Sequence, residues 1–325
     1  MEYRPYGRTG MRVSVLALGC GGFGGIGSTP ELFGRGEDQE TAFALMDRAW
    51  EAGINYLDTA NSYGGGASES MVGEWVRRRG VRDRLIVATK VFNPMGPGPD
   101  DGGLSSRHIL QAVDDSLRRL QTDHLDLYLT HDDDPAVPLE ETLGAFDQLI
   151  RAGKVRAAGA SNLSAVRLAQ ALRVSERSGL ARYESIQNEY NLLHREAETA
   201  LFPLVEREAL AMTPYSPTAG GWLSGKYRKD QPPPPGSRMA LRPEPYRALA
   251  NDRTFRAIEV LAAEAGARGV APITLALAWV VSHPQVTAAV IGPRRVEHFD
   301  SLLPAVDLAL TPEDRLAISA RMDAA

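Results

Sequence analysis

The sequence has little cysteine, and it contains no long apolar run, so two broad classes of protein are unlikely from the start. The single cysteine, Cys20, excludes an intramolecular disulfide framework and is typical of a protein from a reducing compartment. No apolar run approaches the ~20 residues that a membrane-spanning helix needs. Residues 1–5 lack the basic and then apolar pattern of a secretory signal. We therefore expect a cytoplasmic protein with no membrane partner.

Positive charge is also in short supply. The 325 residues include 36 lysines and arginines against 41 acidic residues, which gives a net charge of −5. Nucleic-acid binding needs a concentrated basic surface, so this balance argues against a nucleic-acid partner. The hydrophobic share of 43% and the charged share of 24% are those of an ordinary globular protein. The chain is long enough for one large α/β domain or two smaller ones.

Lysine is the scarcest of the common charged residues. Only four of the 36 basic residues are lysines, namely Lys90, Lys154, Lys226 and Lys229. A preference for arginine codons explains the bias. It also makes Lys90 stand out, because this residue lies in an apolar run. Arginine does not lose its proton, whereas the pKa of a lysine can be tuned by burial and neighbouring charges.

Eight short apolar runs alternate with amphipathic segments along the chain. The expected strands are 13–19, 54–59, 85–91, 125–131, 155–160, 183–187, 210–215 and 287–291. The expected helices are 40–52, 69–79, 107–120, 140–152, 165–178, 196–208, 253–268 and 296–303. Strands that alternate with helices of 10–15 residues indicate βαβ units and a parallel sheet. Eight such units predict a closed (β/α)8 TIM barrel, with residues 1–325 as a single domain.

Polar residues follow the apolar runs at the ends where a barrel of this kind places its active site. These residues are Asp58, Lys90, His131, Ser161, Asn162, Gln187, Tyr215 and Ser216, with Tyr63 on the loop after the second run. A single polar residue at a strand end is common and has no functional meaning by itself. Their joint occurrence predicts a site.

Four of these residues form a consistent catalytic set, namely Asp58, Tyr63, Lys90 and His131. A phenol with a pKa of about 10 is a weak acid near neutral pH. An adjacent ammonium stabilises the phenolate, so we expect Lys90 to lower the pKa of Tyr63, with Asp58 holding Lys90 in place. His131 can orient a carbonyl group or share a proton with Tyr63. This is general acid catalysis for a carbonyl that receives hydride, and a nicotinamide cofactor must supply the hydride.

Several motifs resemble those of the aldo-keto reductase family. Residues 6–14 are similar to its N-terminal hairpin, and residues 55–60 with Tyr63 and Glu69 to its first signature. The further motifs lie at residues 88–91, 127–131, 159–162, 214–217 and 223–227. Residues 103–109 and 138–142 resemble the branch that contains potassium-channel β subunits and their bacterial relatives.

The resemblance implies a (β/α)8 barrel and an NADPH-dependent reductase of aldehydes or ketones, with Tyr63 as the general acid and NADH as a possible second cofactor. It implies that Ser161, Asn162 and Gln187 bind the nicotinamide carboxamide and that Tyr215 stacks on the ring. The residues implied for the cofactor phosphates and for the neighbouring part of the site are Ser216, Pro217, Thr218, Gly220, Lys226, Arg238, Gly292, Arg294 and His298. Arg294 and Arg295 together favour a 2′-phosphate and hence NADPH.

The adenine end departs from the family pattern, because His298, Ser301 and Leu302 replace the usual residues, and this predicts weaker adenine contacts. Residues 226–238 contain a proline-rich stretch, which we interpret as a lid over the barrel mouth or as a surface loop. The glycines at 19, 21, 22, 24 and 25 do not have the spacing of a dinucleotide-binding fingerprint. They indicate close backbone approach at the barrel mouth.

Three aromatic residues, Phe23, Phe92 and Trp222, are candidates for an apolar substrate pocket, although core packing explains them equally well. The carboxylates Asp132, Asp133 and Asp134 lie next to His131. They either cap the following turn or make the entrance repulsive to anionic substrates. The expected partner is a small carbonyl compound, and the sequence leaves its identity and the oligomeric state open.

Two other functions are consistent with parts of the sequence. A regulatory subunit like the channel β subunits would use its bound cofactor as a redox sensor, but the intact catalytic set favours an enzyme. A metal-dependent barrel hydrolase is suggested by His131 and the three aspartates after it. The six histidines are scattered, no His-x-His pair is present, and Lys90 would put a cation in the site. We therefore expect no metal.

Overall fold

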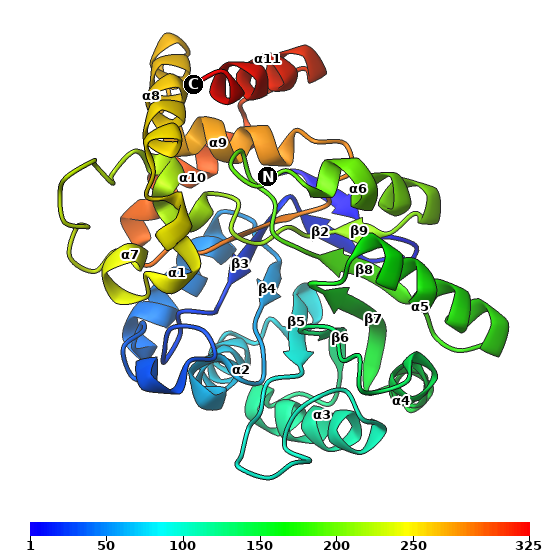
Figure 1. Cartoon of the computed structure of the whole chain (residues 1–325). Helices are drawn as coiled ribbons and strands as arrows, with labels where there is room; N and C mark the ends of the chain where they lie inside the picture. The colour runs from blue at the N-terminus through cyan, green and yellow to red at the C-terminus, as the bar shows by residue number, and fades with distance from the viewer.

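The expected strands form one parallel sheet that closes into a barrel (Figure 1). The computed structural model describes residues 1–325. The strands are β3 (Leu16–Gly19), β4 (Tyr56–Asp58), β5 (Ile86–Val91), β6 (Leu125–Thr130), β7 (Val155–Ser161), β8 (Tyr183–Gln187), β9 (Ala211–Met212) and β10 (Ala289–Ile291). Their order is β10-β3-β4-β5-β6-β7-β8-β9. The backbone N–H groups of Thr287 and Val290 donate to the carbonyls of Met212 and Pro214, at 2.7 and 2.9 Å, and join the two ends of the sheet.

The first expected strand, 13–19, is divided between two structures. Its first residues belong to an antiparallel hairpin of β1 (Tyr3–Pro5) and β2 (Arg12–Ser14), and only β3 enters the barrel. The hairpin covers the N-terminal end of the barrel. Its turn residue Gly7 has φ of +54°, and a Cβ there would lie 2.7 Å from the carbonyl oxygen of Glu184, near the start of β8. Glycine is needed at this contact.

The expected helices form around the sheet with shifts of a residue or two for the longer ones. They are α1 (Gln39–Glu51), α2 (Ala67–Arg79), α3 (Ser106–Leu120), α4 (Leu139–Arg151), α5 (Ala165–Ser178), α6 (Ala197–Glu208), α8 (Asp252–Ala267) and α10 (Phe299–Leu302). Local signals account for their ends. Ser105 caps α3 by accepting from the N–H of His108, and Gly179 ends α5 with φ of +62°.

Three further helices were not predicted, namely α7 (Arg238–Leu241), α9 (Pro272–Val281) and α11 (Pro312–Asp323). Eight of the ten residues of α9 are buried, so this helix lacks the alternation of apolar and polar faces on which the prediction relied. No single helix is long and apolar enough to cross a membrane. The pair α8 and α9 reaches the required length and composition only together, and it is bent by 90°.

Apolar side chains fill two regions. The larger core lies between the sheet and the surrounding helices, and a smaller one fills the barrel interior with residues such as Tyr6, Tyr56, Ala88, Leu127 and Val290. This smaller core fills the barrel interior beneath the C-terminal ends of the strands. The polar side chains of the predicted site lie at those ends, above the core.

The glycine-rich segment after β3 leads to no immediate helix, which agrees with the rejection of a dinucleotide-binding fingerprint. A Cβ on Gly25 would lie 2.8 Å from the Cα of Gly64, and Gly24 has φ of +69°. The predicted close approach of backbones at the barrel mouth is confirmed. It brings the loop after β3 against the loop that carries Tyr63.

Candidate active site

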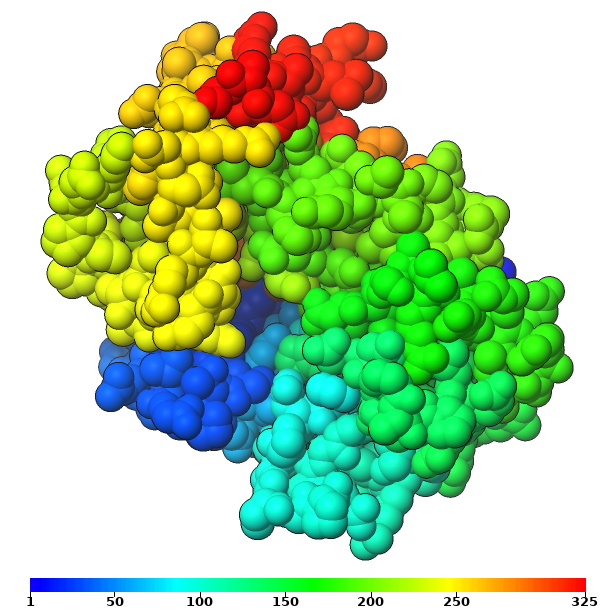
Figure 2. Space-filling model, viewed as in Figure 1, coloured from blue at the N-terminus to red at the C-terminus, as the bar shows by residue number.

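A cavity of about 870 Å³ opens at the C-terminal ends of the barrel strands. Figure 2 shows a hollow near the centre of this face, between the yellow segment that follows α7 and the green segments opposite. Nearly all the predicted site residues line the cavity: Asp58, Tyr63, His131, Ser161, Asn162, Gln187, Tyr215, Ser216, Pro217, Thr218, Gly220, Lys226, Arg238, Gly292, Arg294 and His298. Lys90 does not line it and lies behind this wall.

Lys90 is buried and bound to two acceptors. Its Nζ donates to Asp58 Oδ2 at 2.7 Å and to the carbonyl oxygen of Thr59 at 2.9 Å. The side chains of Lys90 and Asp58 are 1% and 4% exposed. Burial acts to lower the pKa of Lys90, but Asp58 and Tyr63 together raise it above its ordinary value. The ammonium therefore stays charged, 5.2 Å from the centre of the Tyr63 ring.

The pKa of Tyr63 differs from the sequence expectation. Burial raises this pKa, and the opposing effect of Lys90 is smaller, so the pKa lies above its ordinary value. Lys90 acts in the expected direction, but the expectation of a pKa below the ordinary value is wrong. It considered the neighbouring charge without the loss of water around the phenol.

His131 is the hydrogen-bonding neighbour of Tyr63. Its Nε2 lies 3.3 Å from Tyr63 Oη, and the two rings meet edge to face at 5.4 Å. Burial, with a contribution from Lys90, lowers the pKa of His131 to about 3. The imidazole is therefore neutral at neutral pH.

The residues predicted to hold a nicotinamide carboxamide already contact one another or the catalytic set. Gln187 Nε2 donates to Asp58 Oδ1 at 2.9 Å, and Ser161 Oγ donates to the carbonyl oxygen of Gln187. Asn162 has φ of +60°, donates to the carbonyl oxygen of His131, and accepts from the hydroxyl of Tyr215 at 2.9 Å. Gln187 thus restrains Asp58 in addition to facing the cavity, a role that the sequence did not indicate.

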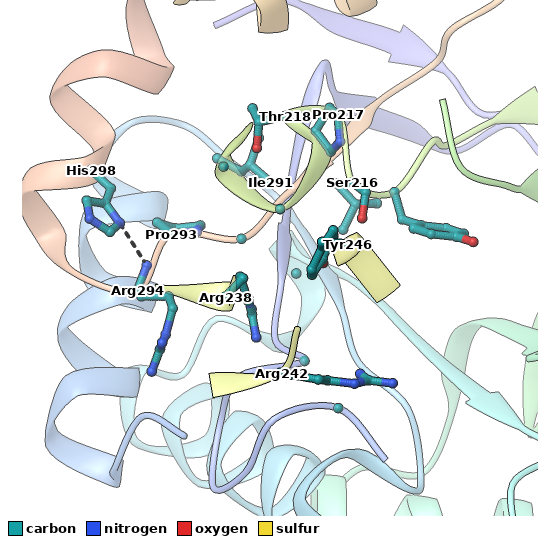
Figure 3. A pocket seen from close by; sticks show the side chains of 18 of the residues that line it. Ser216, Pro217, Thr218, Arg238, Arg242, Tyr246, Ile291, Pro293, Arg294 and His298 are labelled. Atoms are coloured by element: carbon teal, nitrogen blue, oxygen red, sulfur yellow. Dashed lines mark hydrogen bonds between the residues drawn. The ribbon is translucent and has the colours of Figure 1, made fainter. Parts of the chain in front are cut away.

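The other end of the cavity is strongly basic, and Figure 3 shows Arg238, Arg242 and Arg294 there. The cationic residues of the wall are Lys226, Arg238, Arg242, Arg294 and Arg295. Lys226 is open to the cavity, yet partial burial and then the charges of Arg238, Arg294 and Arg295 lower its pKa. Mutual repulsion of this kind is relieved by an anion. This end of the cavity can therefore hold phosphate groups.

One carboxylate belongs to the basic end and was missed by the sequence analysis. Glu37 is 6% exposed and pairs with Arg294, which also donates to the carbonyl oxygen of Gly236 at 2.6 Å. Arg242 and Tyr246 were missed as well, although they line the cavity. Residues 234–238 and Lys226 form part of the wall, which supports the interpretation of the segment 226–238 as a lid.

The three aromatic candidates for a substrate pocket do not line the cavity. Trp222 is 1% exposed and packs against Tyr227 and Phe255, with ring centres 4.8 and 5.6 Å apart. Phe23 is equally buried, and Phe92 packs against the large core. The prediction that Phe23, Phe92 and Trp222 bind substrate is replaced by core packing, the alternative noted for them.

The acidic segment after His131 divides into two roles. Asp133 Oδ1 accepts from Arg167 Nε at 2.8 Å, and Asp134 accepts from the backbone N–H groups of Leu104 and Ala136. Only Asp132 lines the cavity. The capping role therefore holds for Asp134, and the expected acidic rim is reduced to one carboxylate. No cluster of three or more metal-ligating side chains is present anywhere in the chain.

Known proteins of one family are similar to this chain over nearly its whole length. Residues 16–321 match the model of the Aldo/keto reductase family. An uncharacterized oxidoreductase of Bacillus subtilis, YrpG, is 36% identical over 96% of this chain and 93% of its own length. A probable voltage-gated potassium channel subunit beta from Oryza sativa is also 36% identical, over 96% of this chain and 94% of its own. Versiconal hemiacetal acetate reductase from Aspergillus parasiticus is 30% identical, over 97% and 95%. The chain therefore belongs to the aldo/keto reductase family of oxidoreductases.

Proposed function

We propose that this protein reduces an aldehyde or ketone to an alcohol with NADPH, and that Tyr63 is the general acid. The observation that carries the proposal is the geometry of one cavity. A phenol and a neutral imidazole meet at one end, above the buried Asp58–Lys90 pair, and a group of cations lines the other end. The first end suits a carbonyl oxygen that gains a proton, and the second suits the phosphates of a dinucleotide.

The residues present fit NADPH. The backbone turn that follows Tyr215 contains residues with positive φ, including Ser216 at +51°, Ala219 at +50° and Gly220 at +62°. Such turns direct successive N–H groups to one side, and they suit an anion. With Lys226 and Arg238 the turn would hold the pyrophosphate. Arg294 and Arg295 would hold the 2′-phosphate. The bound cofactor would supply a hydride to the carbonyl carbon.

The chain's own residues supply the proton and the polarisation. The raised pKa keeps the Tyr63 hydroxyl protonated at neutral pH, so it can donate to the carbonyl oxygen. As the phenol loses its proton, the ammonium of Lys90 near its ring stabilises the charge that remains. Asp58 holds Lys90 in place, and Gln187 in turn holds Asp58. The neutral His131 provides a second polar contact to the same oxygen.

A second candidate function is a regulatory subunit that senses the redox state of its bound cofactor. The 36% identity to a protein named as a probable potassium channel subunit beta favours it. Both functions share the cofactor site, so binding of NADPH does not distinguish them. Repeated turnover does, because only the reductase oxidises many molecules of NADPH. The test is the absorbance of NADPH followed over many turnovers with a panel of neutral, anionic and aromatic aldehydes and ketones.

Steady oxidation of NADPH that depends on one of the carbonyl compounds supports the reductase. One oxidation event for each bound cofactor, with no further turnover for any compound, supports the regulatory subunit and contradicts the reductase. We further propose that the partner is a small molecule, that the protein acts in the cytoplasm, and that neither a membrane nor a nucleic acid takes part.

A further inference from the structure

A polar cluster that the catalytic scheme does not use lies against the second ring nitrogen of His131. It consists of Ser28, Ser62 and Asn93, from the loops that follow β3, β4 and β5. The nitrogen Nδ2 of Asn93 lies 3.2 Å from His131 Nδ1, 3.3 Å from Ser62 Oγ and 3.4 Å from Ser28 Oγ. The two serine hydroxyls are 2.7 Å apart. His131 is thus held from two sides, by Tyr63 at Nε2 and by Asn93 at Nδ1.

The amide group restricts where the imidazole proton can be. The low pKa of His131 leaves its ring neutral, so the ring carries one proton. The NH2 group of Asn93 can only donate, and every atom around it can accept: a ring nitrogen and two hydroxyl oxygens. His131 Nδ1 must then be the bare acceptor nitrogen. The proton is left on Nε2, the nitrogen that faces Tyr63 Oη.

We propose that Asn93 is a positioning residue that fixes His131 in the Nε2-protonated tautomer, so that the single N–H of the ring points into the reaction site beside the Tyr63 hydroxyl. This inference rests on the proposed carbonyl reduction for its consequence. The carbonyl oxygen then meets two donors, the O–H of Tyr63 and the N–H of His131. In the other tautomer Nε2 would accept from Tyr63 and compete with the substrate for its proton.

The position of Asn93 is fixed by its surroundings. The residue that follows it is Pro94, whose ring disfavours helical backbone at Asn93. The carbonyl oxygen of Phe92, just before it, accepts from the N–H of Gly103 at 2.7 Å. The hydrogen bond between Ser28 and Ser62 fixes the other two acceptors. The amide therefore has a stable direction when substrate arrives.

The decisive variant is Asn93→Asp, which keeps the shape of the side chain and replaces a donor with a carboxylate that only accepts. The carboxylate attracts the ring proton to Nδ1, and the Nε2 donor is lost. We expect kcat for reduction to fall by about 100-fold, the effect of losing one donor to a developing oxyanion. The fall should be in kcat more than in KM, because the contact strengthens as charge develops on the oxygen.

The tautomer can be read directly in the protein without substrate. In long-range 15N–1H spectra of histidine-labelled protein, with His131 assigned by its loss in His131→Gln, the wild type should show a protonated Nε2 and a bare Nδ1. Asn93→Asp should show the reverse. The matched control is Asn188→Asp, which makes the same exchange at a residue whose amide donates to the carbonyl oxygen of Leu163. Its His131 signals should match those of the wild type.

The pH dependence of activity also distinguishes Asn93→Asp from the wild type. A carboxylate at position 93 raises the pKa of His131, so lowering the pH adds a second ring proton and restores the N–H at Nε2. The activity of Asn93→Asp should rise as the pH falls, whereas the wild type should not respond. The other titratable groups that face His131 are Tyr63, which contacts its Nε2, and Lys90, whose charge acts on its pKa. Asp58 and Asp132 line the same cavity. They are common to both proteins, so the comparison isolates position 93.

A second variant, Asn93→Ala, tests the same proposal in case Asn93→Asp does not fold. It removes the donor without reversing it, and the two tautomers should then both be populated. A wild-type spectrum with the proton on Nδ1, or an unchanged tautomer in both variants, overturns the proposal whether or not the protein is active. Lack of turnover with every carbonyl compound contradicts the proposed function instead, because the spectrum of the free protein reads the tautomer on its own.

Discussion

The two ends of the cavity are built on opposite principles. At the catalytic end, strands β4, β5 and β6 hold Asp58, Lys90 and His131 in buried positions or at the strand end, and the groups contact one another. At the basic end, the cations come from loops and short helices, and Arg238 and Arg242 have no carboxylate within 4 Å. One end is complete in the free protein. The other has a surplus of positive charge that an anionic ligand can neutralise.

This difference predicts which measurements a substitution affects. A change at the catalytic end should affect turnover and stability while cofactor binding persists. A change at the basic end should affect cofactor binding and leave the fold intact.

Tyr63→Phe should show the largest effect. Removing the hydroxyl takes away the proton donor, and carbonyl reduction should fall by about 100- to 10,000-fold. The dissociation constant of NADPH should stay within a few-fold of the wild-type value in a fluorescence titration. Near-native activity of this variant at neutral pH would show that Tyr63 is not the acid.

Lys90→Met separates a buried pair from a surface pair. It leaves Asp58 buried without its partner, which should cost about 3–5 kcal/mol of unfolding free energy in urea denaturation. The control is Lys154→Met, whose partner Asp114 and own side chain are 48% and 39% exposed. An exposed pair contributes about 0–1 kcal/mol. Equal losses in the two variants would mean that the Asp58–Lys90 pair is not the buried support that the structure shows.

Arg238→Ala tests the basic end. Loss of one charge-assisted contact costs about 1.5–3 kcal/mol, which is roughly a ten- to hundredfold weaker affinity for NADPH. The affinity for NADH should fall by a similar factor, because Arg238 is assigned to the pyrophosphate, which both cofactors carry. The matched control is Arg228→Ala, because Arg228 is exposed on the same segment and does not line the cavity. Equal dissociation constants of the two cofactors in the wild type would contradict the assignment of a 2′-phosphate site.

Asp132→Asn should have the smallest effect. One charge about 8 Å from an anionic substrate at an effective dielectric near 40 contributes about 1 kcal/mol. The ratio of kcat/KM for a nitrobenzaldehyde and a carboxybenzaldehyde should therefore fall a few-fold, and high salt should remove the difference. Asp133→Asn is the control, since Asp133 is bound to Arg167. A ratio that responds to Asp133 and not to Asp132 would contradict the division of roles.

The two ends also differ in how well the sequence predicted them. The barrel and the site residues on its strands could be predicted from local properties of the chain. These are the alternation of apolar runs with amphipathic segments and the polar residues at the ends of those runs. Glu37 could not be predicted, because it lies in an irregular loop and joins the basic end only through its ion pair with Arg294. Arg242 could not, because it lies at the end of a short helix. Asn93 follows β5 by two residues and carries no pattern of its own. Its contacts with Ser28, Ser62 and His131 exist only in the folded protein, where loops that are distant in the sequence come together.

Burial explains the remaining errors. The sequence gives no measure of how much water surrounds a side chain, so the pKa of Tyr63 was predicted in the wrong direction. Trp222 was given to a pocket for the same reason, since an aromatic residue next to a site motif looks the same in sequence whether it faces a cavity or the core. The helix α9 was missed because its burial on nearly all sides removes the amphipathic pattern.

The pH dependence of kcat/KM for reduction shows whether Tyr63 is a protonated acid beside a neutral His131. Tyr63 must be protonated to donate. Its pKa is raised, so activity should fall only as the pH rises above the ordinary tyrosine value of about 10. His131 has a pKa of about 3, so it stays neutral and adds no limb near pH 6–7. We predict a constant kcat/KM from about pH 5 to about pH 9, with saturating NADPH. An alkaline limb near pH 7–8 that disappears in Tyr63→Phe would show instead that the charge of Lys90 outweighs burial and that the pKa of Tyr63 is lowered.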